Sequence, residues 1–137
     1  MRNEAENTGS RVSVVTGAAL GIGAAIARRF ASAGDHVILN DINSDALTQV
    51  GTEVAQHAAR VTLVPGDITE QATVNALAEA VDRDADGRVD VLVNNVGDFR
   101  PASAIFLKST SAQWERLHQL NLGHVLAVTF ALAPGMV

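Results

Sequence analysis

Apolar residues follow two alternating patterns along this chain. Four short runs are almost continuously apolar, at residues 12–15, 37–40, 61–64 and 89–93. After each of the first three runs comes a longer stretch in which apolar residues recur every three or four positions. Short continuous runs are typical of parallel strands buried on both faces, and the longer period is typical of amphipathic helices. The sequence therefore predicts four buried strands separated by helices.

Glycine and the apolar faces indicate where the helices lie. The first predicted helix follows a glycine-rich turn and ends at Gly34, which suits a C-cap. A fourth, at about residues 111–132, carries Trp114 and Leu117 and is apolar nearly all round after Leu120. Such a helix is expected to be buried on several sides. The apolar faces of the second and third helices consist of Leu47, Val50 and Val54, and of Val74, Leu77 and Val81.

Alternating strands and helices imply a parallel sheet, and right-handed crossovers give it the strand order 3-2-1-4. We expect an α/β fold, a Rossmann-like parallel sheet flanked by helices, that forms one partial domain over residues 11–137 and is truncated before the later strands. Residues 1–10 are polar and are expected to form a disordered N-terminal tail.

Composition and charge argue against several classes of function. The 137 residues are 47% hydrophobic, which is enough for one compact core. A net charge of −5 and a pI near 5.2 argue against nucleic-acid binding, which needs a clustered basic face. Because there is no cysteine and the four histidines share no zinc-like spacing, we expect no metal site. Polar residues interrupt the apolar run after Leu120 and the N-terminus lacks a secretory signal, so we expect no membrane span and a cytoplasmic protein.

The segment Thr16-Gly17-Ala18-Ala19-Leu20-Gly21-Ile22-Gly23 lies between the first predicted strand and the first predicted helix. This placement is typical of a nucleotide-binding loop. Gly17 would make the tight turn, which glycine adopts freely. Gly21 would let phosphates approach the backbone at the helix N-terminus, and Gly23 would let the helix pack closely on the strand. The pattern alone leaves an ordinary glycine-rich loop as the alternative.

Two carboxylates follow predicted strands. Asp41 comes directly after the second strand, where a carboxylate accepts hydrogen bonds from the adenosine ribose and repels a 2′-phosphate. The glycine loop holds no Arg or Lys to offset that charge, so Asp41 favours NAD over NADP. The alternative is a residue that helps to cap the next helix. Asp67 is either an adenine contact or, by its spacing to Glu70, part of a capping box.

In combination these features resemble the short-chain dehydrogenase/reductase family over residues 11–137. The glycine loop has the family's Thr-Gly-x-x-x-Gly-x-Gly spacing. Asn94-Asn95-Val96-Gly97 follows the fourth strand, where the family has Asn-Asn-Ala-Gly. Asn121-Leu122-Gly123 lies in the last helix, where the family has its catalytic asparagine. Val96 departs from the commoner alanine, and we expect that change to be tolerated.

The resemblance implies a role for each matching residue. At the cofactor diphosphate these are Gly17, Leu20, Gly21, Ile22 and Gly23. At the ribose it is Asp41, and at the adenine they are Asp67 and Ile68. Along the adenosine side they are Asn94, Asn95 and Gly97. Asn121 is the implied catalytic residue.

The resemblance implies that residues 11–137 form a partial NAD-binding domain. It also implies an activity, that of an NAD(H)-dependent oxidoreductase acting on a small-molecule alcohol or carbonyl. In the family a tyrosine beside a lysine moves the proton that accompanies hydride transfer. The family's serine and Tyr-x-x-x-Lys would follow the helix that bears Asn121, and this sequence holds no tyrosine. We therefore expect no turnover from these 137 residues alone, and a non-catalytic nucleotide-binding or interaction module is the alternative. A homo-oligomer is also implied, since in the family the last helix commonly joins a subunit interface.

Overall fold

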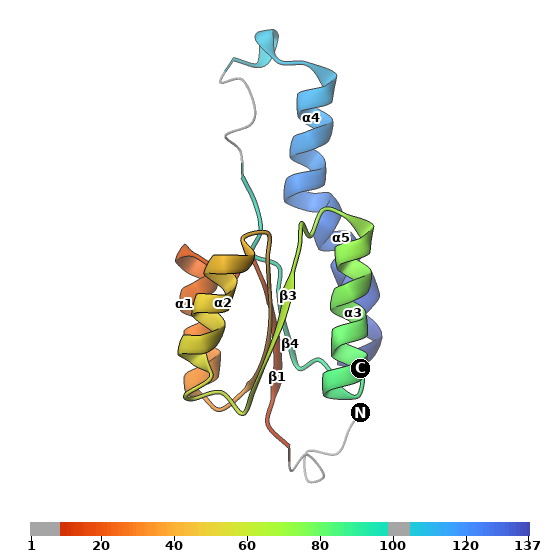
Figure 1. Cartoon of the computed structure of the whole chain (residues 1–137). Coiled ribbons are helices and arrows are strands. Elements are labelled where there is room, and N and C mark those ends of the chain that lie inside the picture. The colour runs from red at the N-terminus through yellow and green to blue at the C-terminus, as the bar shows by residue number, and fades with distance from the viewer. Residues whose placement is uncertain (1–8, 99–104) are drawn as a thin grey trace.

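A parallel four-stranded sheet forms the centre of the fold (Figure 1). This computed structural model describes residues 9–98 and 105–137, so most of the predicted tail at residues 1–10 lies outside the described residues. The strand order β3-β2-β1-β4 confirms the predicted order 3-2-1-4. In the register, Val14 lies between Ile38 and Leu92. The strands are β1 (Val12–Thr16), β2 (His36–Asp41), β3 (Arg60–Pro65) and β4 (Val91–Val93).

Helices cover both faces of this sheet (Figure 1). One face is covered by α1 (Gly21–Ser32) and α2 (Ser44–Val54), and the other by α3 (Gln71–Ala85) and α5 (His124–Leu132). Successive strand residues point to opposite faces, so Val15 enters the core under α1 and α2, whereas Val14 enters the core under α3 and α5. The predicted apolar faces of α2 and α3 are confirmed, because all six of their named residues are buried.

Gly34 follows the end of α1 as predicted. Its φ of +82° lies in the left-handed region that glycine adopts without strain. Its N–H donates to the carbonyl of Ala31 at 2.9 Å, which satisfies one of the open carbonyls at the end of the helix. This turn leads the chain directly into β2.

The two outer strands are less buried than the sequence predicts. Every residue of β1 is buried, but in β3 only Thr62 and Val64 are, and β4 is only partly covered. Within the described chain, β3 and β4 each pair with one neighbour, so one edge of each is open. β4 is also shorter than expected, because Val89 precedes it and donates its N–H to the carbonyl of Gly135. The prediction of full burial is wrong for these strands, since apolar content does not reveal which strands are flanked.

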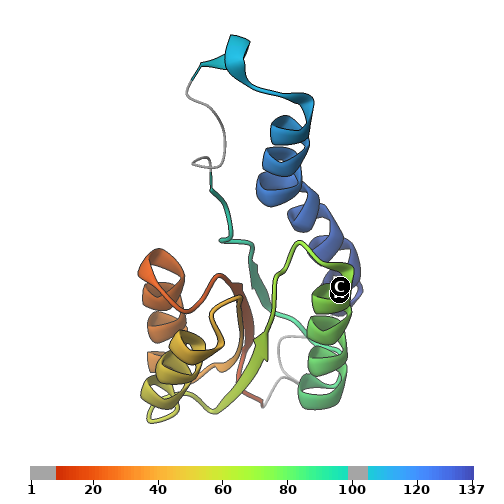
Figure 2. The same ribbon diagram turned by 45° about the horizontal axis from the view of Figure 1, so that its top comes forward.

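The last predicted helix is interrupted in its middle. It begins as α4 (Ser111–His118), widens into the π-helix η2 (Gln119–Gly123), and continues as α5 and the 3-10 helix η3 (Ala133–Met136). Figures 1 and 2 show α5 beside α3, and α4 extending past the carboxyl ends of the strands toward the 3-10 helix η1 (Phe106–Lys108).

Burial on several sides is wrong for this helix. α4 buries no residue, and α5 buries only His124, Val128 and Leu132. Leu126 and Phe130 of α5 are 60% and 87% exposed. α5 packs on α3, and this packing leaves both side chains exposed.

Candidate functional site

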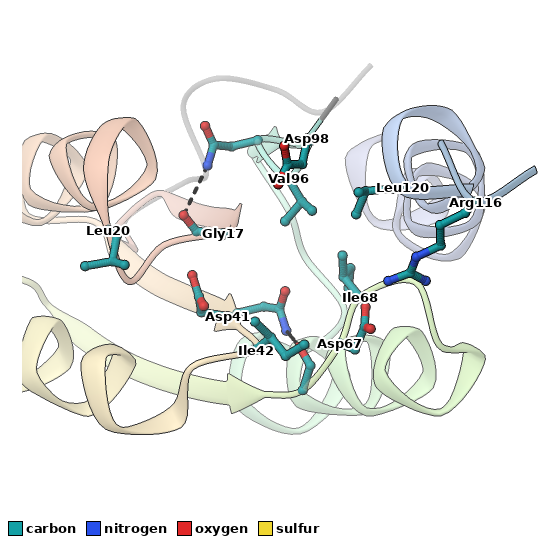
Figure 3. A pocket seen from close by; sticks show the side chains of 14 residues that line it. Gly17, Leu20, Asp41, Ile42, Asp67, Ile68, Val96, Asp98, Arg116 and Leu120 are labelled. Carbon is teal, nitrogen blue, oxygen red and sulfur yellow. Dashed lines mark hydrogen bonds between the residues drawn. The ribbon is translucent and has the colours of Figure 1, made fainter. Parts of the chain in front are cut away.

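A cavity of about 520 Å³ opens at the carboxyl ends of the four strands (Figure 3). It lies where the strand order reverses between β1 and β4, the usual ligand position in an open α/β sheet. The carboxyl ends of all four strands and helix α4 contribute to its wall. Its lining residues are Gly17, Leu20, Asn40, Asp41, Ile42, Gly66, Asp67, Ile68, Asn95, Val96, Gly97, Asp98, Arg116 and Leu120.

The glycine loop forms a backbone cradle with little room for side chains. Gly17 and Gly21 have φ of +64° and +53°, which favours glycine at both positions. A Cβ on Gly17 would lie 2.9 Å from Nδ2 of Asn95. A Cβ on Gly23 would overlap the carbonyl oxygen of Gly17. The sequence predicts that Gly23 lets the helix approach the strand, and the close neighbours that the structure gives it are the loop itself and Asn95.

The loop leads into the N-terminus of α1, which carries no side-chain cap. Leu20 occupies the N-cap position, makes no side-chain cap hydrogen bond, and lines the cavity. Gly21, Ile22 and Gly23 form the first turn and are not part of the cavity lining. Uncapped N–H groups and the partial positive charge of a helix N-terminus favour an anion at this position.

Asp41 joins the glycine loop to the end of β2. One carboxylate oxygen accepts the N–H of Ala19 at 2.9 Å, and the other accepts the N–H of Asn43 at 2.9 Å. Asn43, not Asp41, caps α2, since its side chain accepts the N–H of Ala46. The carboxylate therefore lies in the cavity while it holds the loop in place.

Asp67 does not form the capping box that its spacing to Glu70 allows. Its carboxylate accepts the backbone N–H of Thr69 at 2.9 Å and the Thr69 hydroxyl at 2.7 Å, and Glu70 is the N-cap of α3 without a side-chain cap. Burial alone would raise the pKa of Asp67. The hydrogen bonds from Thr69 and the electrostatic effects of Arg116 and His124 outweigh that effect, so its pKa lies below the ordinary value. Asp67 and Ile68 both line the cavity.

The residues after β4 connect three parts of the site. Asn95 donates its backbone N–H to the Thr16 hydroxyl and its side-chain amide to the carbonyl of Gly17, both at 3.1 Å. Figure 3 draws the bond to Gly17 as a dashed line. Asn94 lies outside the cavity lining, and its amide donates to the Thr129 hydroxyl of α5 at 3.2 Å. These contacts fix the glycine loop against β4, and β4 against α5.

Asn121 lies in the π-helical segment and holds the chain just after Gly97. Its side-chain amide donates to the carbonyls of Asp98, at 2.8 Å, and Leu117, at 2.9 Å. Its side-chain oxygen accepts the N–H of Asp98 at 3.0 Å. π-helical segments often occur at functional sites. Asn121 is not part of the cavity lining, but it positions two residues that are, Gly97 and Asp98.

Several lining residues have no counterpart in the motifs. Asn40 donates from its side chain to the carbonyls of Val64 and Gly66, which ties the end of β2 to that of β3. Arg116 and Leu120 come from α4 and the π-helical segment that follows it. Their spacing of four residues is a sequence signal for one helix face, but only the tertiary structure shows that this face lines the cavity. Asp98 follows Gly97 in the chain and Ile42 follows Asp41, and both Gly97 and Asp41 are predicted site residues.

Two other kinds of site find no support in the described part of the chain. Among residues 9–98 and 105–137, no group of His, Cys, Asp and Glu is arranged to hold a metal ion. None of the helices in those ranges has the length and apolar character needed to cross a membrane.

Comparisons with known proteins identify one family. A family model described as short chain dehydrogenase matches residues 11–137. The chain is 36% identical over 129 residues to 1-deoxy-11-beta-hydroxypentalenate dehydrogenase of Streptomyces exfoliatus, covering 93% of this chain and 46% of that protein. It is 34% identical over 126 residues to 7alpha-hydroxysteroid dehydrogenase of Escherichia coli K12, covering 92% and 48%. The chain thus spans about half the length of these curated relatives.

Solved structures agree with this fold. L-sorbose reductase from Gluconobacter frateurii, complexed with NADPH and L-sorbose, matches with a TM-score of 0.84 at 30% identity, covering 93% of this chain and 48% of that one. A short chain dehydrogenase/reductase from Burkholderia phymatum, in complex with NAD, matches with a TM-score of 0.82 at 32% identity, covering 93% and 44%. The strand order, the glycine loop and the family model agree, and this chain belongs to the short-chain dehydrogenase/reductase family.

Proposed function

We propose that this chain is the cofactor-binding part of an NAD(H)-dependent oxidoreductase that acts on a small-molecule alcohol or carbonyl. The observation that carries the proposal is the cavity, which brings together the glycine loop, Asp41, the Asp67–Ile68 pair and the segment after β4. These groups come from four strand ends, and each has a chemistry that one part of a dinucleotide requires.

The residues present fit such a ligand. Gly17 and Gly23 lie where a side chain has no room, and the uncapped first turn of α1 offers N–H groups to a diphosphate. Asp41 offers a carboxylate to ribose hydroxyls, and Ile68 offers an apolar surface near the expected base position. A bound nicotinamide supplies the hydride chemistry, while the protein orients it and excludes water.

NAD is proposed over NADP because of the charge at Asp41. Both oxygens of this carboxylate already accept a backbone N–H, which holds the charge in place at the end of β2. A 2′-phosphate beside it would bring two negative charges together. The solved neighbours include complexes with NADPH and with NAD, so the family alone does not decide the preference.

The preference is tested by calorimetric titration of NAD and NADP into the wild type and an Asp41→Asn variant. The wild type should bind NAD more tightly, and removing the charge should narrow the difference by about tenfold, or ~1.4 kcal/mol. The matched control is Asp45→Asn, an exposed carboxylate in the first turn of α2. Equal affinities in the wild type, or an unchanged ratio in Asp41→Asn, would contradict the NAD assignment.

Asn121 is proposed as the catalytic residue that this segment of the family pattern contributes. Its hydrogen bonds to the backbone of Asp98 show that it shapes the cavity edge. The 137 residues include no tyrosine to carry the proton. We therefore expect them to bind the cofactor without turnover, as measured by NADH absorbance over a panel of alcohols and ketones. Turnover that Asn121→Ala abolishes would overturn this expectation.

A further inference from the structure

Arg116 is a cation in the cavity wall that the family motifs leave unassigned. It lies on α4, and Figure 3 shows its side chain reaching toward Asp67 and Ile68. Arg116 takes part in none of the salt bridges between described residues. Arg116 lines the cavity, and its charge lowers the pKa of Asp67 although no salt bridge within residues 9–98 and 105–137 joins the two side chains.

The position of Arg116 identifies which end of the ligand it would meet. Figure 3 places Arg116 and Leu120 on the side of the cavity opposite Asp41 and Leu20. The glycine loop and Asp41 serve the diphosphate and ribose under the proposed function. The remaining end, between Ile68 and Leu120, is bounded by apolar side chains on two sides. That end suits a flat aromatic base.

We propose that Arg116 recognises the adenine ring, by placing its planar guanidinium against the base of the bound nucleotide. This inference rests on the proposed nucleotide binding and adds a specificity-determining residue to it. A guanidinium attracts an aromatic face and stacks on it, which an ammonium group does less well because it is compact and strongly hydrated. Arg116 lies away from the 2′-hydroxyl side, so it should act equally on nucleotides with and without a 2′-phosphate.

The test is calorimetric titration of three probes into the 137-residue chain. ADP carries the base and a 5′-diphosphate, adenosine 2′,5′-bisphosphate carries the base with one phosphate at the 5′ position and one at the 2′ position, and inorganic pyrophosphate carries no base. The variants are Arg116→Gln, which removes the charge, and Arg116→Lys, which keeps the charge and removes the planar group. Arg29→Gln is the matched control, because Arg29 is an exposed arginine on α1 outside the cavity.

Arg116→Gln should lower the affinities for ADP and adenosine 2′,5′-bisphosphate by the same factor, about three- to tenfold. It should leave the affinity for pyrophosphate unchanged. Arg116→Lys should recover only part of the loss, and Arg29→Gln should match the wild type. Circular dichroism confirms that each variant is folded before titration.

Three results would overturn the inference. An unchanged ADP affinity in Arg116→Gln would remove Arg116 from recognition. A loss confined to adenosine 2′,5′-bisphosphate would make it a phosphate ligand, and an equal loss on pyrophosphate would make it a source of general electrostatic attraction. If the wild type binds none of the three probes, the proposed function itself fails, which is distinguishable from failure of Arg116 alone.

Discussion

Gly23 packs so closely against the glycine loop that one added methyl group collides with it. The colliding atom is the carbonyl oxygen of Gly17, a backbone atom that cannot rotate away. Gly21 differs, because a Cβ there meets no atom within 4 Å and the only obstacle is its φ of +53°. A side chain at Gly23 is therefore excluded by a steric clash, whereas a side chain at Gly21 is disfavoured only by backbone strain.

We predict that Gly23→Ala destabilises the chain more than Gly21→Ala does. Gly21→Ala should lower the free energy of unfolding by about 1–2 kcal/mol, the strain of an L-residue in the left-handed region. Gly23→Ala should exceed that value and abolish NAD binding, because the cradle must open to admit the methyl group. Urea unfolding compares the two variants, and a smaller loss in Gly23→Ala would contradict the close packing of Gly23 on the carbonyl of Gly17.

Asn121 acts on the cavity through the backbone of Asp98. We predict that Asn121→Ala speeds hydrogen exchange at the Asp98 amide and weakens NAD binding, since three hydrogen bonds of about 1 kcal/mol each are lost. Asn121→Asp keeps an acceptor for the Asp98 N–H and should protect that amide better than Asn121→Ala. If both variants exchange at the wild-type rate, Asn121 does not position this segment.

Sequence motifs identify the site residues that lie at fixed positions after strands. They miss the residues that reach the cavity only through the tertiary structure. Gly17, Asp41 and Asp67 are predicted from their places after strands, and the structure puts all three in one cavity. Arg116 lies in a segment whose polar pattern resembles any exposed helix face. Its role depends on where α4 lies over the sheet, which local sequence does not specify.

At the scale of elements, a buried network joins the start of β2 to β3 and α3. His36 is 5% exposed, and its Nε2 lies 3.0 Å from the Thr62 hydroxyl, which in turn donates to Asp84. Burial, with the nearby charge of Arg60, lowers the pKa of His36 although Asp84 opposes the shift. The folded chain therefore keeps this ring neutral at a pH where the unfolded chain protonates it.

This network predicts that the chain loses stability as the pH falls below about 6.5, the ordinary pKa of histidine. The folded state binds fewer protons than the unfolded state in that range, so the free energy of unfolding rises with pH and falls on acidification. His36→Asn keeps a polar partner for Thr62 and should flatten the dependence between about pH 7 and pH 5. Urea unfolding midpoints measured across that pH range test the prediction. If the midpoint of the variant falls as steeply on acidification as that of the wild type, the pH dependence arises from groups other than His36.

The last helix shows what apolar pattern can and cannot predict. Its place along the chain is correct, but the π-helical segment is absent from the prediction. The side chain of Asn121 competes for the carbonyl of Leu117, which an α-helix offers to the backbone N–H of residue 121. That competition depends on a side-chain rotamer, and no period of apolar residues encodes it.

At the scale of the whole molecule, the exposed face of α5 is the largest departure from the expected burial. Leu122 of η2 and Leu126 and Phe130 of α5 recur every four residues and remain exposed. Recurrence at that spacing places them on one side of the helix. An apolar strip of this kind favours contact with another protein surface.

We propose that a second copy of the chain covers this strip. The substitutions Leu126→Ser and Phe130→Ser together should lower the mass measured by light scattering to that of a monomer. Leu107→Ser is the control, because Leu107 is equally apolar and 91% exposed but lies on η1. A wild-type chain that stays monodisperse and monomeric at high concentration would contradict the proposed homo-oligomer.

The cavity at the carboxyl ends of the strands is the place where the proposed function puts a nicotinamide dinucleotide. A titration with NAD, followed by amide chemical shifts, tests this placement residue by residue. We expect shifts in the glycine loop, at Asp41, at Asp67 and Ile68, and from Asn95 to Gly97. No shifts, or shifts confined to a separate cavity lined by Ala78, Asp82 and Gly135 between α3 and η3, would contradict it.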